Sequence, residues 1–308
     1  MALQYYRTFV YDNSRWDGFE FREGDIVIST PPKAGTTWTQ RICAALVFGT
    51  AELEQPLSRL SPWLDMLTRS RDDVFALLAS QTHRRFIKTH TPLDGLPWDE
   101  RVTYICVGRD PRDIACSWDN HTDNLDVERF LKVREQATGS NADIQGIVDN
   151  GMPEKPPTPQ ERFWMWADDA TPVNETPTSL ANVFNHLATF WKERSRPNVV
   201  LLHYDDMKRD LDGQMRMLAR RLAITIPEER WPELVEAATF ERMKKDADKT
   251  APNTSEAIWQ SNENFFHRGT SGQWREFLAG DDRERYATRV REIADAELAH
   301  WAHHERLF

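Results

Sequence analysis

The sequence predicts an α/β fold with a central parallel sheet flanked by helices. Short β-rich runs alternate with helical patterns along the chain, and each β-rich run is followed by a turn of polar or charged residues. The clearest predicted strands are Asp25–Thr30, Arg85–Thr89, Val102–Val107 and Asn198–Tyr204. Because ligands bind at the carboxyl ends of the strands in such sheets, we expect these turns to converge on one crevice.

Two helices are predicted from the spacing of apolar residues. One covers residues 179–196, where apolar side chains recur with helical period, and the other covers residues 283–301. From about residue 121 to residue 177 the sequence becomes polar and rich in proline, including MPEKPPTPQ. We therefore expect a single domain over residues 1–308, with a lid or insertion at about 121–177.

Bulk properties exclude several classes of protein. No apolar run approaches the roughly 18 to 20 residues of a membrane span, and the N-terminus lacks the pattern of a secretory signal, so a soluble cytoplasmic protein is expected. Cys43, Cys106 and Cys116 show no zinc-like spacing and are expected to be reduced core thiols. The formal charge of -10 argues against nucleic acid as a partner, so an anionic ligand would need a local basic pocket.

The first predicted strand leads into a motif suited to phosphate, IVISTPPKAGTTWTQRI. A strand, a tight turn and a helix would bring Lys33, the hydroxyls of Thr36 and Thr37 and several backbone N–H groups to a positive helix terminus. Gly35 permits close approach of the backbone. This P-loop-like arrangement lacks the GK[ST] ending of a Walker A loop, which disfavours an ATPase. The alternative is an ordinary turn in which Thr36 only caps the helix.

The second motif, FIKTHTPLDGLP, places Lys88 and His90 two residues apart on a strand. Both side chains therefore lie on the same face of the sheet, at the edge of the expected crevice. A histidine there could take the proton of an acceptor hydroxyl. The alternative is a structural histidine at the corner between strand and loop.

Two further motifs contain arginines in turns. In YICVGRDPRDIACSW, Arg109 suits bidentate phosphate recognition and Ser117 could add a hydroxyl, although the Arg-Asp pairs could also be solvated ion pairs. In FFHRGTSGQWREF, Arg268 and two glycines suggest a mobile loop that closes over an anion. The alternative there is an ordinary surface loop anchored by Trp274.

Together, the four motifs resemble the family of sulfotransferases that use 3′-phosphoadenosine-5′-phosphosulfate (PAPS). KAGTTW, KTH, GRDPRDIACSW and RGxxGxW occur in the family's order and at similar separations. The phrases FIKTHTPLDGL and YICVGRDPRD and the FFxRGxSGxW pattern are most similar to actinobacterial (mycobacterial-type) glycolipid sulfotransferases. The resemblance covers nearly the whole chain and implies an enzyme with PAPS as donor and 3′,5′-adenosine bisphosphate (PAP) as product.

The resemblance implies roles on the donor side. Lys33 would bind the phosphosulfate bridge, the following turn the 5′-phosphate, and Arg109 with Ser117 the 3′-phosphate, with Arg268 and Gly269 closing over it. The full set of implied donor-binding residues is Lys33, Ala34, Gly35, Thr36, Thr37, Trp38, Arg109, Ser117, Tyr204, Thr239, Phe240, His267, Arg268 and Gly269.

The resemblance also implies a mechanism by in-line displacement without a metal. His90 would be the general base for the acceptor hydroxyl, Lys33 would stabilise the leaving oxygen, and Lys88 would help to neutralise the sulfuryl oxygens. The acceptor could be a glycolipid, a phenol or an alcohol. Two alternatives stay open at this stage, a kinase-like phosphotransferase and a noncatalytic module that binds adenosine bisphosphate.

Several positions depart from the family pattern. Ala34 replaces a serine, His267 stands where many members have arginine, and Ala238 replaces a hydroxyl residue before Thr239. We therefore expect the 3′-phosphate to be held less tightly than in the family, or differently. The segment after Arg275 does not reproduce the family's C-terminal dimer motif, so that mode of dimerisation is doubtful and the oligomeric state is left open.

Aromatic residues are the candidates for the acceptor site. The chain has 12 tryptophans, and an aromatic wall suits sugars, phenols and lipids equally. Those in segments that could line the crevice are Trp63, Trp98, Trp118, Trp164, Trp166 and Trp259. Trp164 and Trp166 are the preferred pair because a Pro-rich lid has little core of its own to fill, although core packing is the alternative for each tryptophan.

A histidine cluster, His300, His303 and His304, lies near the C-terminus. Helical geometry could bring two of the imidazoles onto one metal ion. The favoured alternative is a set of polar residues at the C-terminus of a helix, where the helix dipole stabilises cations. No metal site is therefore predicted.

Overall fold

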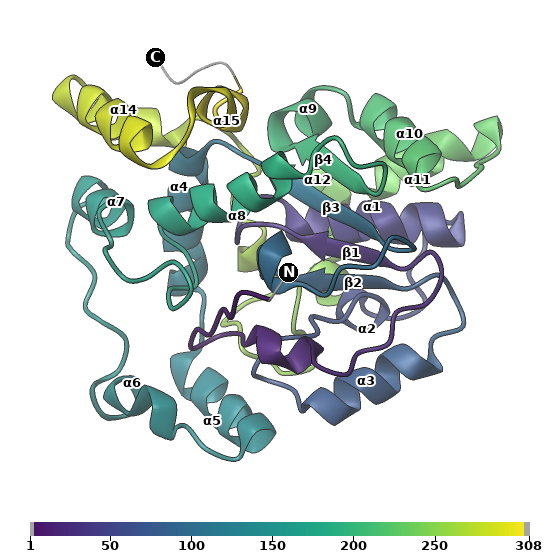
Figure 1. Cartoon of the computed structure of the whole chain (residues 1–308), viewed down its shortest axis with the longest axis horizontal. Helices are drawn as coiled ribbons and strands as arrows, with labels where there is room; N and C mark the ends of the chain where they lie inside the picture. The colour runs from purple at the N-terminus through teal and green to yellow at the C-terminus, as the bar shows by residue number, and fades with distance from the viewer. Residues whose placement is uncertain (1–2, 305–308) are drawn as a thin grey trace.

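A parallel sheet forms the centre of the protein (Figure 1). The computed structural model describes residues 3–304, and within them the sheet has four strands in the order β2-β1-β3-β4. Their bounds are Ile26–Ser29 (β1), Phe86–Thr89 (β2), Thr103–Gly108 (β3) and Val199–His203 (β4). Three lie inside their predicted ranges and β3 extends one residue beyond its range, to Gly108, so the expected α/β class is confirmed.

Helices flank this sheet and also extend away from it (Figure 1). The α-helices are α1 (Thr36–Phe48), α2 (Leu57–Leu60), α3 (Arg71–Ser80), α4 (Pro111–Asp123), α5 (Val127–Thr138), α6 (Gln145–Asn150), α7 (Pro159–Ala167), α8 (Leu180–Lys192), α9 (Tyr204–Arg209), α10 (Leu211–Arg221), α11 (Trp231–Ala237), α12 (Phe240–Lys245), α13 (Ala247–Thr250), α14 (Asp281–Ile293) and α15 (Ala296–Ala302). Short 3-10 helices are η1 (Asn13–Trp16), η2 (Leu93–Gly95), η3 (Ala142–Ile144), η4 (Glu228–Arg230), η5 (Glu263–Phe265) and η6 (Gln273–Glu276).

Alternation along the strands divides the core into two layers. Val27 and Tyr104 pack in one cluster with residues of α4, α7, α8, α14 and α15. Their strand neighbours Ile28 and Ile105 pack in a second cluster with residues of α1, α9, α10 and α11. Because successive side chains of a strand point to opposite faces, the near-continuous apolar runs of these strands fit a sheet that is covered on both sides.

The C-terminal part differs from its prediction. Residues 283–301 were expected to form one helix, but the chain breaks it into α14 and α15. Ala294 adopts extended backbone, and the Asp295 side chain accepts a hydrogen bond from the Leu298 N–H at the start of α15. An aspartate that caps a new helix therefore overrides the continuous apolar spacing.

The proline-rich region at residues 121–177 contains more regular structure than a loop. It includes α5, α6 and α7, and α5 and α6 lie at the lower left of Figure 1, away from the sheet. Helix α7 packs against the core, where Trp164 and Trp166 are 9% and 7% exposed. The preference for these two tryptophans as acceptor residues was therefore wrong, because α7 fills the space over the α4–α8 side of the sheet.

Two other expectations concern side chains and membranes. Cys43, Cys106 and Cys116 are free thiols, and all are buried as predicted. Among residues 3–304, no helix combines the length and apolar character needed to cross a bilayer.

Candidate functional site

The turns after the strands open onto one large cavity of about 630 Å³. Its polar half includes Lys33, Gly35, Thr36, Thr37, Trp38, Arg109, Ser117, Tyr204, Thr239, Phe240, His267, Arg268, Gly269 and Thr270. Its apolar half includes Phe9, Val10, Tyr11, Trp63, Met66, Trp118, Leu125, Phe130, Ile258 and Trp259. Lys88, His90, His121 and Phe265 also line this cavity.

The turn between β1 and α1 has an unusual backbone. Lys33 adopts the left-handed region with φ 67°, and Gly35 follows with φ 115° as the N-cap of α1. Left-handed backbone at a residue other than glycine costs roughly 1–3 kcal/mol and is common at functional sites. Gly35 has no side chain with which to cap the helix, so the first N–H groups of α1 are directed to the cavity end without a side-chain partner. The positive end of α1 is therefore suited to an anion.

Arg109 connects this turn to the end of β3. Its Nη1 donates a 2.7 Å hydrogen bond to the Lys33 carbonyl, and its guanidinium lies 4.2 Å from the centre of the Tyr204 ring. The side chain is 6% exposed, and its Nε is buried without a hydrogen-bond partner among residues 3–304. Arg109 lines the cavity, and a guanidinium on a cavity wall suits an anionic ligand.

An aromatic and glycine-lined cleft continues from this point. The Trp38 indole donates a 2.7 Å hydrogen bond to the Ala238 carbonyl and lies edge-on to Tyr204. A Cβ atom at Gly269 would lie 2.7 Å from the Phe240 ring, so this close approach requires glycine. Flat rings around a narrow space suit a planar heterocycle such as a purine.

The loop before η6 is fastened to two acidic residues. The Gly272 N–H donates a 2.7 Å hydrogen bond to Asp113, and the Ser271 hydroxyl donates a 2.8 Å hydrogen bond to Asp205. Burial raises the pKa of Asp113 to about 6, against the opposing charge of Arg109. These contacts hold the loop beside the cavity, while the Arg268 side chain is 54% exposed.

His90 is held in one orientation at the edge of the sheet. It is 7% exposed, and its Nδ1 donates a 2.7 Å hydrogen bond to the Thr30 carbonyl, which leaves Nε2 as the unprotonated nitrogen. Burial and the nearby Lys88 charge lower the pKa of His90 well below its ordinary value. The imidazole is therefore neutral at pH 7 and able to accept a proton.

Lys88 and His90 share a tryptophan neighbour. Lys88 Nζ lies 4.1 Å from the centre of a Trp63 ring, and His90 packs edge-on to Trp63 at 4.6 Å. The Trp63 indole donates to Asp65, a buried carboxylate that also accepts hydrogen bonds from the hydroxyls of Thr89 and Thr91. Burial lowers the pKa of Lys88 to about 7, against the opposing charge of Asp65. Trp63 thus fixes both basic side chains at the cavity wall.

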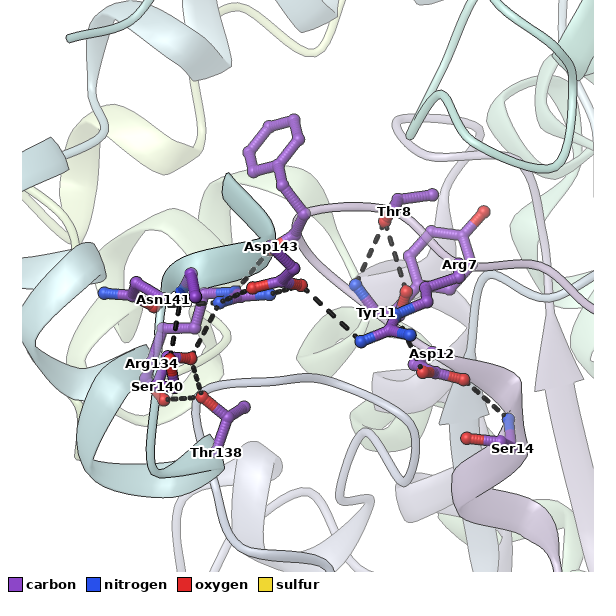
Figure 2. A network of polar contacts seen from close by, with 12 residues as sticks. Arg7, Thr8, Tyr11, Asp12, Ser14, Arg134, Thr138, Ser140, Asn141 and Asp143 are labelled. Carbon is purple, nitrogen blue, oxygen red and sulfur yellow. Dashed lines mark hydrogen bonds and ion pairs between the residues drawn. The ribbon is translucent and has the colours of Figure 1, made fainter. Parts of the chain in front are cut away.

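The apolar half combines segments that are far apart in the sequence. Phe9 meets Phe130 of α5 edge-on at 6.1 Å, and both line the cavity. Arg134 of α5, which is 1% exposed, donates a hydrogen bond to the Phe9 carbonyl and pairs with Asp143. Figure 2 shows this network joining the N-terminal segment to the end of α5. A polar network therefore holds the apolar wall in place from behind.

The cavity brings together most of the residues that the sequence singled out. His90, Lys33, Lys88 and every predicted donor residue except Ala34 line it. The Ala34 side chain is fully buried in the core, and its N–H donates to the Pro31 carbonyl within the turn. Its contact with the donor stays a prediction. Among the candidate tryptophans, Trp63, Trp118 and Trp259 line the cavity, whereas Trp98 stacks on Tyr104.

His121 was missed by the sequence reasoning although it lines the cavity. It lies four residues after Ser117 on α4, and residues with this spacing share one face of a helix. That spacing was the signal available in the sequence.

The C-terminal histidines do not form the cluster considered from the sequence. His303 is buried and bonded to the Tyr286 hydroxyl and the Ala299 carbonyl. His304 pairs with Asp206 at 2.9 Å and stacks on His203. His203 already contacts the Asp205 N–H and the Ala302 carbonyl through its two ring nitrogens. The possible ligand atoms of His203, Asp206 and His304 lie within 4.8 Å of one another.

A basic strand-loop-helix turn, a second arginine turn and an oriented histidine around one cavity define an enzyme that acts on a phosphate-bearing nucleotide. The model of the sulfotransferase domain matches residues 23–299, and the chain therefore belongs to the sulfotransferase family. It is a sulfotransferase that uses PAPS as donor. This membership removes the kinase and noncatalytic alternatives.

Relatives of known function support the assignment. The chain is 43% identical over 309 residues to a glycolipid sulfotransferase of Mycobacterium bovis, covering 98% of this chain and 94% of the relative. It is 26% identical to the luciferin sulfotransferase of Photinus pyralis, over 83% of this chain and 68% of the relative.

Solved structures share the fold at low sequence identity. Retinol dehydratase in complex with retinol and PAP aligns with a TM-score of 0.68 and 20% identity, over 92% of this chain and 86% of that structure. Mouse sulfotransferase SULT7A1 in complex with PAP aligns with a TM-score of 0.67 and 18% identity, over 94% of this chain and 90% of that structure.

Proposed function

We propose that the chain transfers the sulfuryl group of PAPS to a hydroxyl of a glycolipid, with His90 as the general base. The observation that carries this proposal is the orientation of His90. Its Nδ1 is committed to the Thr30 carbonyl, and its other nitrogen stays unprotonated in a cavity with Lys33 and Lys88. His90 takes the hydroxyl proton as the acceptor oxygen bonds to sulfur. The bond between sulfur and the bridging phosphate oxygen breaks, and PAP leaves.

The two halves of the cavity support a donor and an acceptor of different chemistry. In the polar half, Lys33 and the N-terminus of α1 hold the 5′-phosphosulfate, and Arg109 with Ser117 holds the 3′-phosphate. In the apolar half, aromatic and aliphatic side chains such as Trp259, Phe130 and Ile258 favour an acceptor with both a ring and a lipid portion. The glycolipid activity named for the Mycobacterium bovis relative agrees with this choice.

A mass-spectrometric screen tests the proposal. Purified protein is incubated with PAPS and sets of glycolipids, phenols and simple alcohols, and products with an added SO₃ unit are scored. We expect the highest kcat/KM with a glycolipid, and we expect turnover to be unchanged by a metal chelator because no residue assigned here needs a metal. Preference for a phenol or alcohol would contradict the glycolipid assignment, and loss of turnover with the chelator would contradict the metal-free mechanism.

A further inference from the structure

A second histidine, His121, lies between the two halves of the cavity. It comes from the last turn of α4 and packs against three aromatic rings. Its ring centroid is 4.6 Å from that of Trp259, 5.5 Å from that of Trp118 and 5.6 Å from that of Phe265. The rings restrict the orientation of the imidazole, so its nitrogen atoms have defined directions.

The imidazole contacts Lys33 directly. Lys33 Nζ lies 3.3 Å from His121 Nδ1 and 4.3 Å from the centre of the Phe265 ring. A lysine side chain has about 2 kcal/mol of rotamer entropy, so a free ammonium would spread over many positions. A hydrogen-bond acceptor on one side and an aromatic face on another restrict it to one position.

The local charges determine which group carries the proton. Lys33 interacts electrostatically with five neighbouring groups. The charges of Arg109 and Lys88 act on Lys33, and the Lys33 charge acts on His90, His121 and His267. Desolvation and the Lys33 charge lower the pKa of His121 well below its ordinary value. Desolvation, followed by the charges of Arg109 and Lys88, lowers the pKa of Lys33 to about 7. When Lys33 is charged, its ammonium can only donate, so the neutral imidazole then accepts at Nδ1.

We propose that His121 is a positioning residue for Lys33, whose ammonium it orients by accepting a hydrogen bond at Nδ1. The bond also stabilises the charged form of Lys33, because a deprotonated amine is a weaker donor. This inference rests on the proposed role of Lys33 at the oxygen that links sulfur to phosphate. A misplacement of that ammonium by about 1 Å is enough to slow a reaction about 10²-fold.

Substitutions at His121 separate hydrogen bonding from packing. His121→Phe keeps an aromatic ring but has no acceptor, whereas His121→Asn places an amide oxygen near the position of Nδ1. His83→Phe is the matched control, because His83 also packs on aromatic rings, those of Phe48 and Phe86, and does not line the cavity. Should His121→Phe fail to fold, His121→Leu replaces it as the variant without an acceptor.

We expect His121→Phe to lower kcat about 10-fold to 100-fold at saturating PAPS and acceptor. PAP affinity should change by less than about threefold, which is under 1 kcal/mol. The basic limb of the pH profile should move to lower pH, because Lys33 loses its proton more readily. His121→Asn should recover most of kcat and return the limb toward its wild-type position, and His83→Phe should leave both unchanged.

Two outcomes would overturn the inference. One is a wild-type kcat and pH profile in His121→Phe, and the other is an equal loss in His121→Asn when both variants keep their melting temperature and PAP affinity. Calorimetry of PAP binding gives an independent measurement. The pKa of Lys88 is also about 7, so the pKa of Lys33 is read from the difference in proton uptake between the wild-type protein and His121→Phe. Absence of sulfuryl transfer by the wild-type protein would refute only the proposed function. The calorimetric test of the inference would remain: a lower midpoint of proton uptake in His121→Phe supports it, and an unchanged midpoint overturns it.

Discussion

Part of the polar half of the cavity, including Lys33 and Arg109, comes from turns that directly follow strands, whereas the apolar half is assembled from segments without such a relation to the sheet. Lys33 and Arg109 follow β1 and β3 by a few residues. Phe9 and Trp259, by contrast, are 250 positions apart in the sequence, and both line the cavity. The position of a polar side chain in the first group follows from strand topology alone. The position of a ring in the second group depends on packing between helices and loops.

This comparison predicts that variants of the two halves affect different kinetic constants. The largest effect is expected for His90, which acts where donor and acceptor meet. His90→Asn should lower kcat by a factor of about 10²–10⁴, because a positioned general base accelerates a reaction by that factor. PAP affinity should be retained. Steady-state kinetics measures kcat and calorimetry measures PAP affinity. His83→Asn is the control outside the cavity. An unchanged kcat with a competent acceptor would refute the role of His90.

Arg109→Lys tests the polar half. An ammonium cannot both reach the Lys33 carbonyl and offer a forked pair of donors to a phosphate, so we expect PAP affinity to fall by about 1.5–3 kcal/mol. The KM for the acceptor should stay close to its wild-type value. Arg216→Lys is the control, because Arg216 forms ion pairs with Asp212 and Glu228 on another surface. An equal rise in the Kd for PAP and in the KM for the acceptor would contradict the separation of the two halves.

Arg134→Met tests the polar network that supports the apolar half of the cavity. The methionine keeps an apolar stem but leaves the Phe9 carbonyl and Asp143 without their buried donor, which should cost about 1–3 kcal/mol of unfolding free energy. We expect the acceptor KM to rise and PAP affinity to stay unchanged. Thermal unfolding and calorimetry provide the readouts, and Arg101→Met, at an exposed pair with Asp99, is the control. Weaker PAP binding at an unchanged acceptor KM would be the opposite of this expectation.

The smallest expected effect distinguishes wall from core tryptophans. Trp259→Phe should change the ratio of kcat/KM between two acceptors about twofold to tenfold, as expected for one aromatic contact of about 0.5–1.5 kcal/mol. Trp164→Phe should lower the melting temperature and leave that ratio unchanged, because Trp164 packs in the core and donates to Asp282. A change of ratio in Trp164→Phe alone would restore the earlier assignment of the acceptor wall to α7.

The sequence was sufficient for the sheet and for most of the polar half. Strand patterns located β1 to β4, and charged turns identified Lys33 and Arg109, because both signals are local. It failed for Trp164, whose burial depends on how α7 packs over the core. The motif around Ala34 shows that a turn is used but not which of its side chains point inward, and the Ala34 side chain is buried in the core. His121 was detectable in principle, but only from the face that it shares with Ser117.

Thr30, at the end of β1, has contacts in two directions. Its carbonyl accepts from His90, and its hydroxyl lies 2.5 Å from that of Thr36 at the start of α1. The general base and the phosphate-binding turn are therefore both bonded to Thr30, so the distance between them depends on this one residue. The residues that surround the acceptor belong to other segments. New acceptor preferences can thus arise by exchange of those segments, while the reactive core is inherited as one unit.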